Sequence, residues 1–443
     1  MSQKQVAIVG HNNTRAAVTG QEELLVKINS SNPLNSIITE GVATASDAFG
    51  RQRVSEPYTL GDYKHLYGLD PNFIDVLTAG GTVTFQPNQA CARLSTTTST
   101  NSSAIHQTKF YHQYLPGKSQ LIYATFNFYA ASTGVTKRTG YFDNLNGIFF
   151  QQDGDGTLRF IIRTSTSGSP VDAENITQEN WNTDKCDGTG PSKFSLDITK
   201  TQILFIDFQW LGVGRVRIGF VHDNTFVIAH EFMHSNTLPV VYMSNPNLPV
   251  RCEISSNGSN PAAYFDQICS TVLSEGGYAE SGQDWAAQNT SLRTVASGAT
   301  TPILVIRLKN TFNSYLNRMI VRLSRYSITS TNQLLSYRVV KLPNTAALTT
   351  GTAWVDVNTN SGVQYNIGGT AITGGEVLDA GYVAASNSAK ESLTAVSNPT
   401  TAKKNYIVQN YNSNDSELYA IVVTNLGANT TDVGVSMQWR EIY

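Results

Sequence analysis

The chain has 443 residues, and only 14% of them are charged, against roughly a quarter in an average soluble protein. Its formal net charge of -2 and pI of 6.4 leave no basic excess to neutralise nucleic-acid phosphates or to bind an anionic membrane. No apolar run approaches the roughly 20 residues of a membrane helix, and the first residues lack the apolar core of a signal peptide. We therefore expect no nucleic-acid partner, no membrane insertion and no export by the general secretory route.

Residues 1–45 carry few large apolar side chains and cannot build a core of their own. We expect an extended N-terminal arm that becomes ordered against a partner or another subunit, with a loose tail as the alternative. A main domain opens at residue 46. Within it, residues 60–76 are the one segment typical of a short helix or an irregular excursion.

From residue 82 the chain alternates apolar or β-branched runs with Gly, Pro, Asp and Asn turns, as antiparallel strands do. The clearest part is 203–233, where a Gly212/Gly214 break and a turn at 222–225 separate three strand-like segments in a row. This part predicts an antiparallel meander. The strands expected in this domain cover 82–85, 92–102, 108–114, 119–129, 139–142, 147–151, 157–164, 203–210, 215–221, 226–233, 240–244, 250–255 and 265–273.

A polar, glycine-containing segment at 274–277 predicts a boundary, and a second β-domain follows it. Residues 344–404 are rich in Thr, Ala, Gly and Ser, and we expect mostly loops there. The spacing fits a sandwich or a jelly roll. The predicted domains are thus 1–45, 46–277 and 278–443. The expected C-terminal strands cover 303–308, 319–326, 336–342, 354–357, 406–411, 418–424 and 433–440.

The segment His230-Glu231-Phe232-Met233-His234 matches H-E-x-x-H, a zinc metalloprotease pattern that needs both histidines on one face of a helix. The preceding residues are β-branched and follow a turn, which predicts a strand instead. On a strand, residues four apart lie roughly 13 Å from each other, too far for both imidazoles to bind one zinc ion. Glu253 is a conceivable third ligand, but it also lies in a strand-like run. We interpret the match as coincidental and predict no metal and no cofactor.

Two groups of carboxylates remain. Asp153-Gly154-Asp155-Gly156 alternates acids with glycine, which can hold calcium but is also typical of a hairpin turn, and we favour the turn. A glycosidase would need two carboxylates at a defined separation. The strand candidates contain Asp197, Asp207, Glu231 and Glu253, which we interpret as strand-face residues rather than a catalytic pair. No catalytic residue is predicted.

Trp181 lies in the polar segment 179–182 and is the tryptophan best suited to stack on a sugar ring; the alternative is that it anchors its own loop. The four cysteines contain no C-x-x-C pair and lie among apolar residues. We expect buried free thiols, with a Cys252–Cys269 disulfide as the alternative.

The central region resembles a family of uncharacterised virion proteins of tailed bacteriophages, common in marine and cyanobacterial viruses. The resemblance covers roughly 46–277 and leaves the C-terminal domain unaccounted for. It rests on SDAFGRQRVS at 46–55, PGKSQ at 116–120, GYFDNLNGIFF at 140–150, DGTGPS at 187–192, LDITKTQ at 196–202, WLGVGRVR at 210–217 and ICSTVLSEGG at 268–277.

The resemblance implies a lectin-like β-sandwich over 46–277, in a protein assembled in the host cytoplasm into the virion. Together with the strand spacing of 278–443, we expect an all-β protein of two antiparallel, lectin-like or jelly-roll-like sandwiches. The resemblance implies no catalytic residues. We expect a non-enzymatic tail, fibre or baseplate subunit that attaches the particle to the host surface, contacting other virion proteins and a host glycan, with Trp181 as the glycan contact. By analogy it forms a homo-oligomer, for which we take a trimer. The alternatives are a capsid decoration or head-fibre protein and a polysaccharide depolymerase.

Overall fold

The computed structural model describes residues 17–18, 24–25, 56–258, 262–385 and 406–443. The chain forms two compact units, Met1–Ala45 and Ser46–Tyr443. The first contributes one antiparallel pair, β1 (Ala17–Val18) with β2 (Leu24–Leu25). The predicted N-terminal arm otherwise lies outside the described residues, as does the 46–55 motif.

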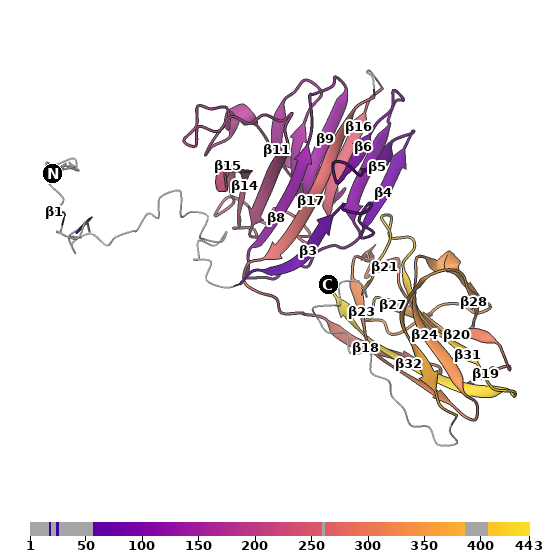
Figure 1. The fold of residues 1–443 in the computed structure, drawn as a ribbon. Coiled ribbons are helices and arrows are strands. Elements are labelled where there is room, and N and C mark those ends of the chain that lie inside the picture. The colour runs from indigo at the N-terminus through magenta and orange to yellow at the C-terminus, as the bar shows by residue number, and fades with distance from the viewer. Residues whose placement is uncertain (1–16, 19–23, 26–55, 259–261, 386–405) are drawn as a thin grey trace, which may run out of the picture. The chain divides into compact units, whose positions relative to one another are not determined.

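The second unit is all-β, and its strands pair in antiparallel sheets that form β-sandwiches (Figure 1). The first sandwich combines a seven-stranded sheet, β12-β11-β10-β9-β16-β7-β4, with an eight-stranded sheet, β15-β14-β13-β8-β17-β6-β5, and β3 pairs with β17. Its strands are β3 (Tyr58–Lys64), β4 (Phe73–Thr78), β5 (Thr82–Gln86), β6 (Cys91–Ser95), β7 (Ser103–Thr108), β8 (Gln120–Asn127), β9 (Val135–Phe142), β10 (Gly147–Gln152), β11 (Leu158–Thr164), β12 (Val171–Thr177), β13 (Gln202–Phe208), β14 (Arg215–His222), β15 (Thr225–Met233), β16 (Val250–Ser256) and β17 (Tyr264–Ser274).

Aromatic side chains from both sheets fill the space between them. Phe126 on β8 and Phe220 on β14 come from the eight-stranded sheet, and Phe150 on β10 and Phe160 on β11 come from the seven-stranded sheet. All four are 0% exposed. Because burying one such ring contributes roughly 1.5–3 kcal/mol, this layer is the main source of cohesion between the sheets.

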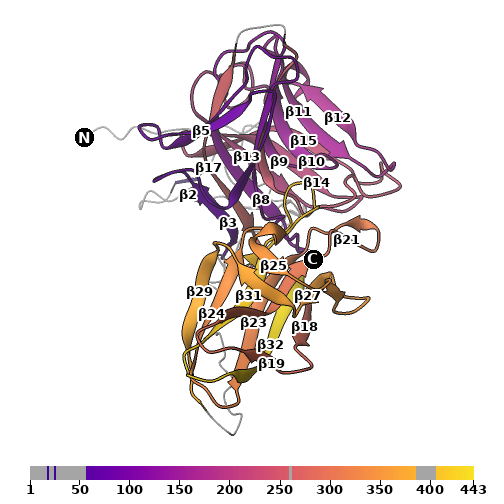
Figure 2. The same cartoon turned by 90° about the vertical axis from the view of Figure 1, so that its right-hand side faces the viewer.

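The predicted meander over 203–233 is confirmed. β13 pairs with β14 and β14 with β15, both antiparallel, and Figure 2 labels the three strands from the side. Asp223 and Asn224 link β14 to β15 with φ angles of 46° and 60°, the left-handed pair that a two-residue type I′ hairpin requires. Aspartate and asparagine tolerate this conformation better than other side chains do.

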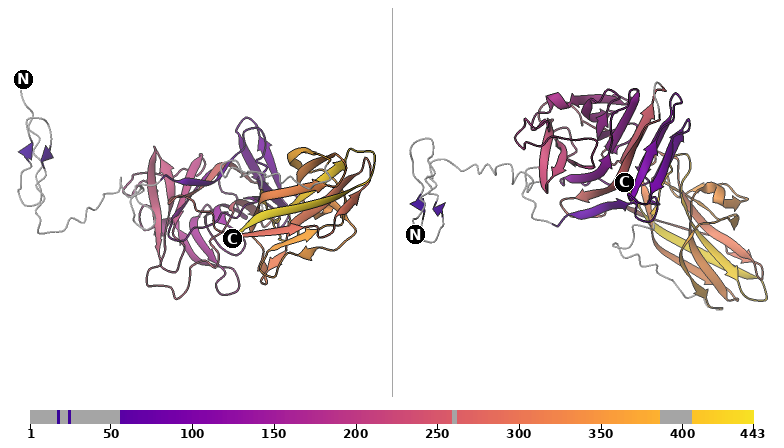
Figure 3. Two further views of the ribbon diagram at one scale, coloured as in Figure 1. Left: turned by 90° about the horizontal axis from the view of Figure 1, so that it is seen from below. Right: turned by 45° about the horizontal axis from the view of Figure 1, so that its top comes forward.

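The C-terminal strands also form two antiparallel sheets with a buried apolar cluster (Figure 3). One sheet has the order β18-β32-β23-β30, with β19 paired to β32, and the other has the order β26-β27-β20-β31-β24-β29. Trp439, Tyr326 and Ile306 belong to the buried cluster between them. The strands are β18 (Gln283–Gln288), β19 (Arg293–Val295), β20 (Thr300–Leu308), β21 (Thr311–Phe312), β22 (Tyr315–Leu316), β23 (Ile320–Ser330), β24 (Leu335–Leu342), β25 (Leu348–Thr350), β26 (Val355–Asp356), β27 (Val363–Asn366), β28 (Gly369–Ile372), β29 (Glu376–Val383), β30 (Tyr406–Ile407), β31 (Leu418–Asn425) and β32 (Thr431–Ile442).

Four local predictions are wrong. The expected strand at 108–114 is mostly the loop that follows β7. The expected helix or excursion at 60–76 is instead two strands, β3 and β4, because β3 finds its partner in β17, some two hundred residues away. The expected strand at 240–244 is a turn-rich loop. The expected loops at 344–404 contain β25 to β29, although 386–405 lie outside the described residues. The boundary at 277/278 stays a prediction, since residues 46–443 form one compact unit.

All four cysteines are free thiols, as predicted, so the alternative Cys252–Cys269 disulfide is wrong. Cys91, Cys186 and Cys252 are buried, and Cys269 is half-buried. Burial raises the pKa of Cys91 to about 11 and those of Cys186 and Cys252 to about 12. In the described ranges, no helix has the length and apolar character needed to span a bilayer.

Candidate functional site

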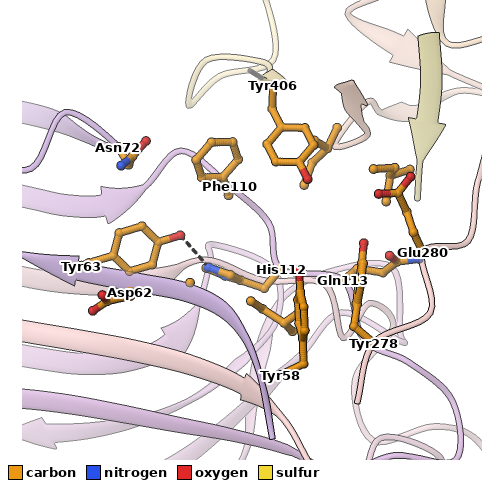
Figure 4. A pocket seen from close by; sticks show the side chains of 14 residues that line it. Tyr58, Asp62, Tyr63, Asn72, Phe110, His112, Gln113, Tyr278, Glu280 and Tyr406 are labelled. Carbon is orange, nitrogen blue, oxygen red and sulfur yellow. Dashed lines mark hydrogen bonds between the residues drawn. The ribbon is translucent and has the colours of Figure 1, made fainter. Parts of the chain in front are cut away.

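A pocket of about 300 Å³ lies between the start of the first sandwich and the C-terminal sheets (Figure 4). Its lining comes from β3, from the turn before β4, from the loop that follows β7, from the segment after β17 and from β23, β30 and β32. The lining residues are Tyr58, Leu60, Gly61, Asp62, Tyr63, Asn72, Phe110, His112, Gln113, Tyr278, Glu280, Ile320, Tyr406 and Ile442.

Two pairs of aromatic rings form facing walls of this pocket. Tyr58 and Tyr278 stack with their centroids 4.7 Å apart and their planes 13° from parallel. Across the pocket, Phe110 and Tyr406 meet edge to face with centroids 5.8 Å apart (Figure 4). Each pair fixes the orientation of its rings, so the walls are formed before any ligand arrives.

The Tyr63 hydroxyl lies 2.8 Å from Nε2 of His112, and Nδ1 of His112 lies 3.1 Å from the carbonyl oxygen of Leu248. A carbonyl can only accept, so Nδ1 carries the proton and Nε2 accepts the proton of Tyr63. Gly61 makes this contact sterically possible. A Cβ there would lie 2.5 Å from the Tyr63 ring and 2.6 Å from Nε2 of His112.

The charged groups of the lining are already paired. Asp62 receives Lys64 Nζ at 3.0 Å. Glu280 Oε1 forms ion pairs with the guanidinium groups of Arg322 at 2.7 Å and Arg440 at 3.4 Å. Arg440 also forms an ion pair with Asp284. The pocket is therefore close to neutral overall, although two carboxylates border it.

The wall tyrosines stay neutral well into the alkaline range. Burial raises the pKa of Tyr406 to about 12, and burial, followed by the charge of Glu280, raises the pKa of Tyr278 still further. Their hydroxyls therefore remain hydrogen-bonding groups at any physiological pH.

A concave, preformed pocket rich in aromatic rings, with polar groups between them, has the character of a small-ligand site. Apolar sugar faces stack on such rings, and polar groups between the rings bind sugar hydroxyls. The sequence did not point to these residues, because they come from segments up to 384 positions apart (Tyr58 to Ile442). The available signal was the high tyrosine count, 20 in all, which does not single out any position.

The prediction of Trp181 as a glycan contact does not agree with the structure. Trp181 is 3% exposed and stacks on Phe160 with centroids 4.2 Å apart. Its indole belongs to the core of the first sandwich, together with Phe150 and Phe220. A ring enclosed in this way cannot offer a face to a sugar, so the alternative interpretation, a loop anchored to its own domain, is the correct one.

The first four residues of the H-E-x-x-H segment lie on β15, as the strand prediction required, and His234 follows the strand directly. The two histidines have separate partners. Nδ1 of His230 accepts the backbone N–H of Asn182 at 3.2 Å. His234 lies 2.7 Å from the carbonyl oxygen of Gly214 through Nδ1 and 2.6 Å from Glu174 through Nε2. Glu253, the conceivable third ligand, belongs to β16 in the other sheet. Within the described residues, no cluster of three or more His, Cys, Asp or Glu is placed to hold a metal ion.

The remaining acidic candidates also have structural partners. Asp153 closes the β10–β11 hairpin, with its carboxylate 2.5 Å from both Gln151 and Arg159. Asp207 pairs with Arg217 on the neighbouring strand. Glu253 contacts Arg251 at 2.6 Å and Arg138 at 2.8 Å.

The two other members of the proposed carboxylate set are also placed. Asp197 is exposed in a turn rather than on a strand, where it accepts from Thr199. Glu231 lies on β15, 3.9 Å from Arg215.

No protein-family model matches the chain, and no curated protein matches it. Several solved β-sandwich structures are similar to about half of it. The legume lectin-like domain from Entamoeba histolytica is 9% identical, covers 49% of this chain and 98% of its own, and has a TM-score of 0.30. A β-1,3-glucanase from Mycobacterium marinum is 10% identical, with coverages of 49% and 100% and a TM-score of 0.34. The CBM2 module of the evolved Dit of Lactobacillus casei BL23 phage J-1 is 7% identical, with coverages of 51% and 99% and a TM-score of 0.32. Likenesses at this level carry no functional weight.

Proposed function

We propose that this chain is a non-catalytic, glycan-binding attachment subunit of a tailed-bacteriophage particle. The observation that supports the proposal is the pocket walled by Tyr58, Tyr278, Phe110 and Tyr406. The resemblance of residues 46–277 to tailed-phage virion proteins supplies the biological setting. The sparsely charged surface suits subunits that bury polar area against one another.

The pocket is small for a high-affinity site, since small-molecule sites range over roughly 300–1,000 Å³. One site of this size binds a sugar weakly. On a particle carrying several copies, weak sites act together, and the combined affinity exceeds that of one site by roughly 10²–10⁴-fold. Attachment through a homo-oligomer, for which we take a trimer, follows this logic.

Substitution in the walls tests the glycan part of the proposal. We expect Tyr278→Ala and Tyr406→Ala each to weaken binding of the full chain to host-envelope polysaccharide by about tenfold or more, since each removes a stacking surface. The measurement is biolayer interferometry on immobilised envelope glycan. Tyr315→Ala is the matched control, because Tyr315 is 78% exposed and lies outside the pocket. Unchanged binding in both pocket variants, with both variants folded, would refute the glycan site.

Immunogold labelling of intact particles tests the placement. Antibody against residues 278–443 should decorate the tail tip, fibres or baseplate. Label spread over the head would instead identify a capsid decoration protein. Release of reducing sugar from the same polysaccharide would favour a depolymerase over the non-catalytic subunit.

A further inference from the structure

We infer that the pocket selects a neutral, hydroxyl-rich sugar and rejects sugars that carry a carboxylate, sulfate or phosphate. This inference rests on the proposed glycan-binding function and names the ligand class of the same site. It follows from the direction of the hydrogen bonds around the pocket and from the pairing of its charges.

Several groups of the polar lining are left as acceptors, beside the wall tyrosine hydroxyls that can both donate and accept. The Tyr63 hydroxyl donates its hydrogen bond to Nε2 of His112, so towards the pocket the phenolic oxygen can only accept. Gln113 uses Nε2 to reach Ser281 Oγ at 2.5 Å and the carbonyl oxygen of Tyr443 at 3.2 Å. Gln113 is 7% exposed, and its buried side-chain carbonyl oxygen has no hydrogen-bond partner among the described residues. A buried acceptor of this kind is costly unless a donor reaches it.

The two carboxylates extend the acceptor set. Both guanidinium contacts of Glu280 fall on Oε1, which leaves Oε2 as a further acceptor. Asp62 borders the pocket with a side chain that is 49% exposed. Among the described residues that line the pocket, none is Lys or Arg, so an anionic sugar would find no cationic partner in the lining to replace its hydration.

The same carboxylates do not call for a cationic ligand. Asp62 is paired with Lys64, and Glu280 and Asp284 are balanced by Arg322 and Arg440. With no uncompensated negative charge, an ammonium group gains little Coulomb energy and loses its hydration. Neutral hydroxyls donate to the acceptors at a lower desolvation cost. The volume admits about one or two sugar rings, which suits the terminal unit of a glycan.

The test compares neutral, anionic and cationic methyl glycosides. Methyl glycosides of glucose, galactose, mannose and N-acetylglucosamine are the neutral probes, methyl glucuronide is the anion, and methyl glucosaminide is the cation. Binding to the full wild-type chain and to Tyr278→Ala is measured by isothermal titration calorimetry at pH 7. We expect at least one neutral glycoside to bind about tenfold tighter than the glucuronide and no more weakly than the glucosaminide, and to lose its binding in Tyr278→Ala.

The outcomes separate the two proposals. Tightest binding of the glucuronide or the glucosaminide, abolished by Tyr278→Ala, would overturn the neutral-sugar inference and leave the glycan site intact. Binding that Tyr278→Ala does not change, or no binding of any probe, would overturn the site itself and the inference with it.

A second variant tests the acceptor role directly. Tyr63→Phe removes the phenolic oxygen and keeps the ring, so we expect affinity for the neutral sugar to fall about fivefold, the equivalent of one hydrogen bond. Tyr129→Phe is the control, because Tyr129 lies outside the pocket. This variant also loses a partly buried hydroxyl hydrogen bond, the one that Tyr129 donates to Asp266 at 2.7 Å. Thermal melting verifies that both variants fold. Full affinity in Tyr63→Phe would show that the acceptor is not used.

Discussion

Trp181 and Tyr278 are both aromatic residues in polar segments of the sequence, yet only Tyr278 lines a cavity. Trp181 is enclosed by rings from β11 and β14, which are distant from it in sequence. Local residue propensities and short motifs do not show which distant side chains cover a given ring. Tyr278 stacks on Tyr58 and keeps part of its surface open. Residue type alone suggested Trp181 as an aromatic ring open to a sugar, and the packing of the sandwich buries that ring.

His230 gives a prediction at this scale. Burial lowers its pKa from 6.5 to about 4, against a smaller opposing effect of Glu174. The unfolded chain then takes up a proton between pH 6.5 and 4 while the folded chain resists it, so stability falls as the pH drops through this window. Between pH 7 and 4, we expect the free energy of unfolding to fall by about 1–3 kcal/mol more in the wild type than in His230→Gln.

Thermal melting over that pH range measures the difference. His222→Gln is the matched control, since the His222 side chain is 47% exposed. Parallel pH profiles for the wild type and His230→Gln would contradict the prediction.

The β13–β15 meander and the β3–β4 region show which elements a sequence predicts. The meander is built from neighbours joined by short connections, so its alternation and its Asp223-Asn224 turn are visible locally. β3 instead depends on β17, and the 60–76 segment alone is compatible with a helix. The meander was predictable because its hydrogen bonds close between neighbours in sequence, whereas β3 was missed because a distant strand completes it.

Lys137 on β9 gives a prediction at the scale of elements. Its ammonium is buried and donates to the backbone carbonyls of Phe128 and Ala130, so it ties β9 to the segment after β8. Burial lowers its pKa from 10.5 to about 8. Between pH 8 and 10.5 the unfolded chain holds more protons than the folded chain, so this residue's contribution to stability increases as the pH rises.

Between pH 7 and 10, we expect the free energy of unfolding of the wild type to rise by about 2 kcal/mol relative to that of Lys137→Met, as measured by urea denaturation. Lys200→Met, at an exposed position, should show no such gain. A difference between wild type and Lys137→Met that does not change with pH would contradict this account.

At the scale of the whole molecule, the all-β architecture was predictable because its signals, low charge and repeated strand-turn alternation, are spread over hundreds of residues. The pocket was not, since its walls combine residues near 60 and 110 with residues near 280, 406 and 442. No spacing rule connects such positions. Only the completed packing of β3 and β17 with the C-terminal strands brings them together.

A bound sugar should therefore stabilise both sandwiches. At a ligand concentration of 100 times Kd, binding adds about 2.7 kcal/mol. For a cooperative unit of this size, that corresponds to a rise in Tm of about 3 °C. Differential scanning calorimetry with the tightest-binding glycoside measures it, and Tyr278→Ala should show no rise. A wild-type Tm that does not move at saturating sugar would place the binding outside the folded pocket.

The four thiols have a consequence for chemical labelling. Alkylating reagents attack the thiolate, and three of the cysteines are buried with strongly raised pKa values, while Cys269 Sγ lies 3.3 Å from Thr125 Oγ1. The three buried cysteines thus offer little background to maleimide dyes at neutral pH, and the half-buried Cys269 is the native thiol to replace before labelling. Asp62→Cys, on the exposed border of the pocket, then becomes the preferred attachment point for a fluorophore, at the loss of one carboxylate acceptor.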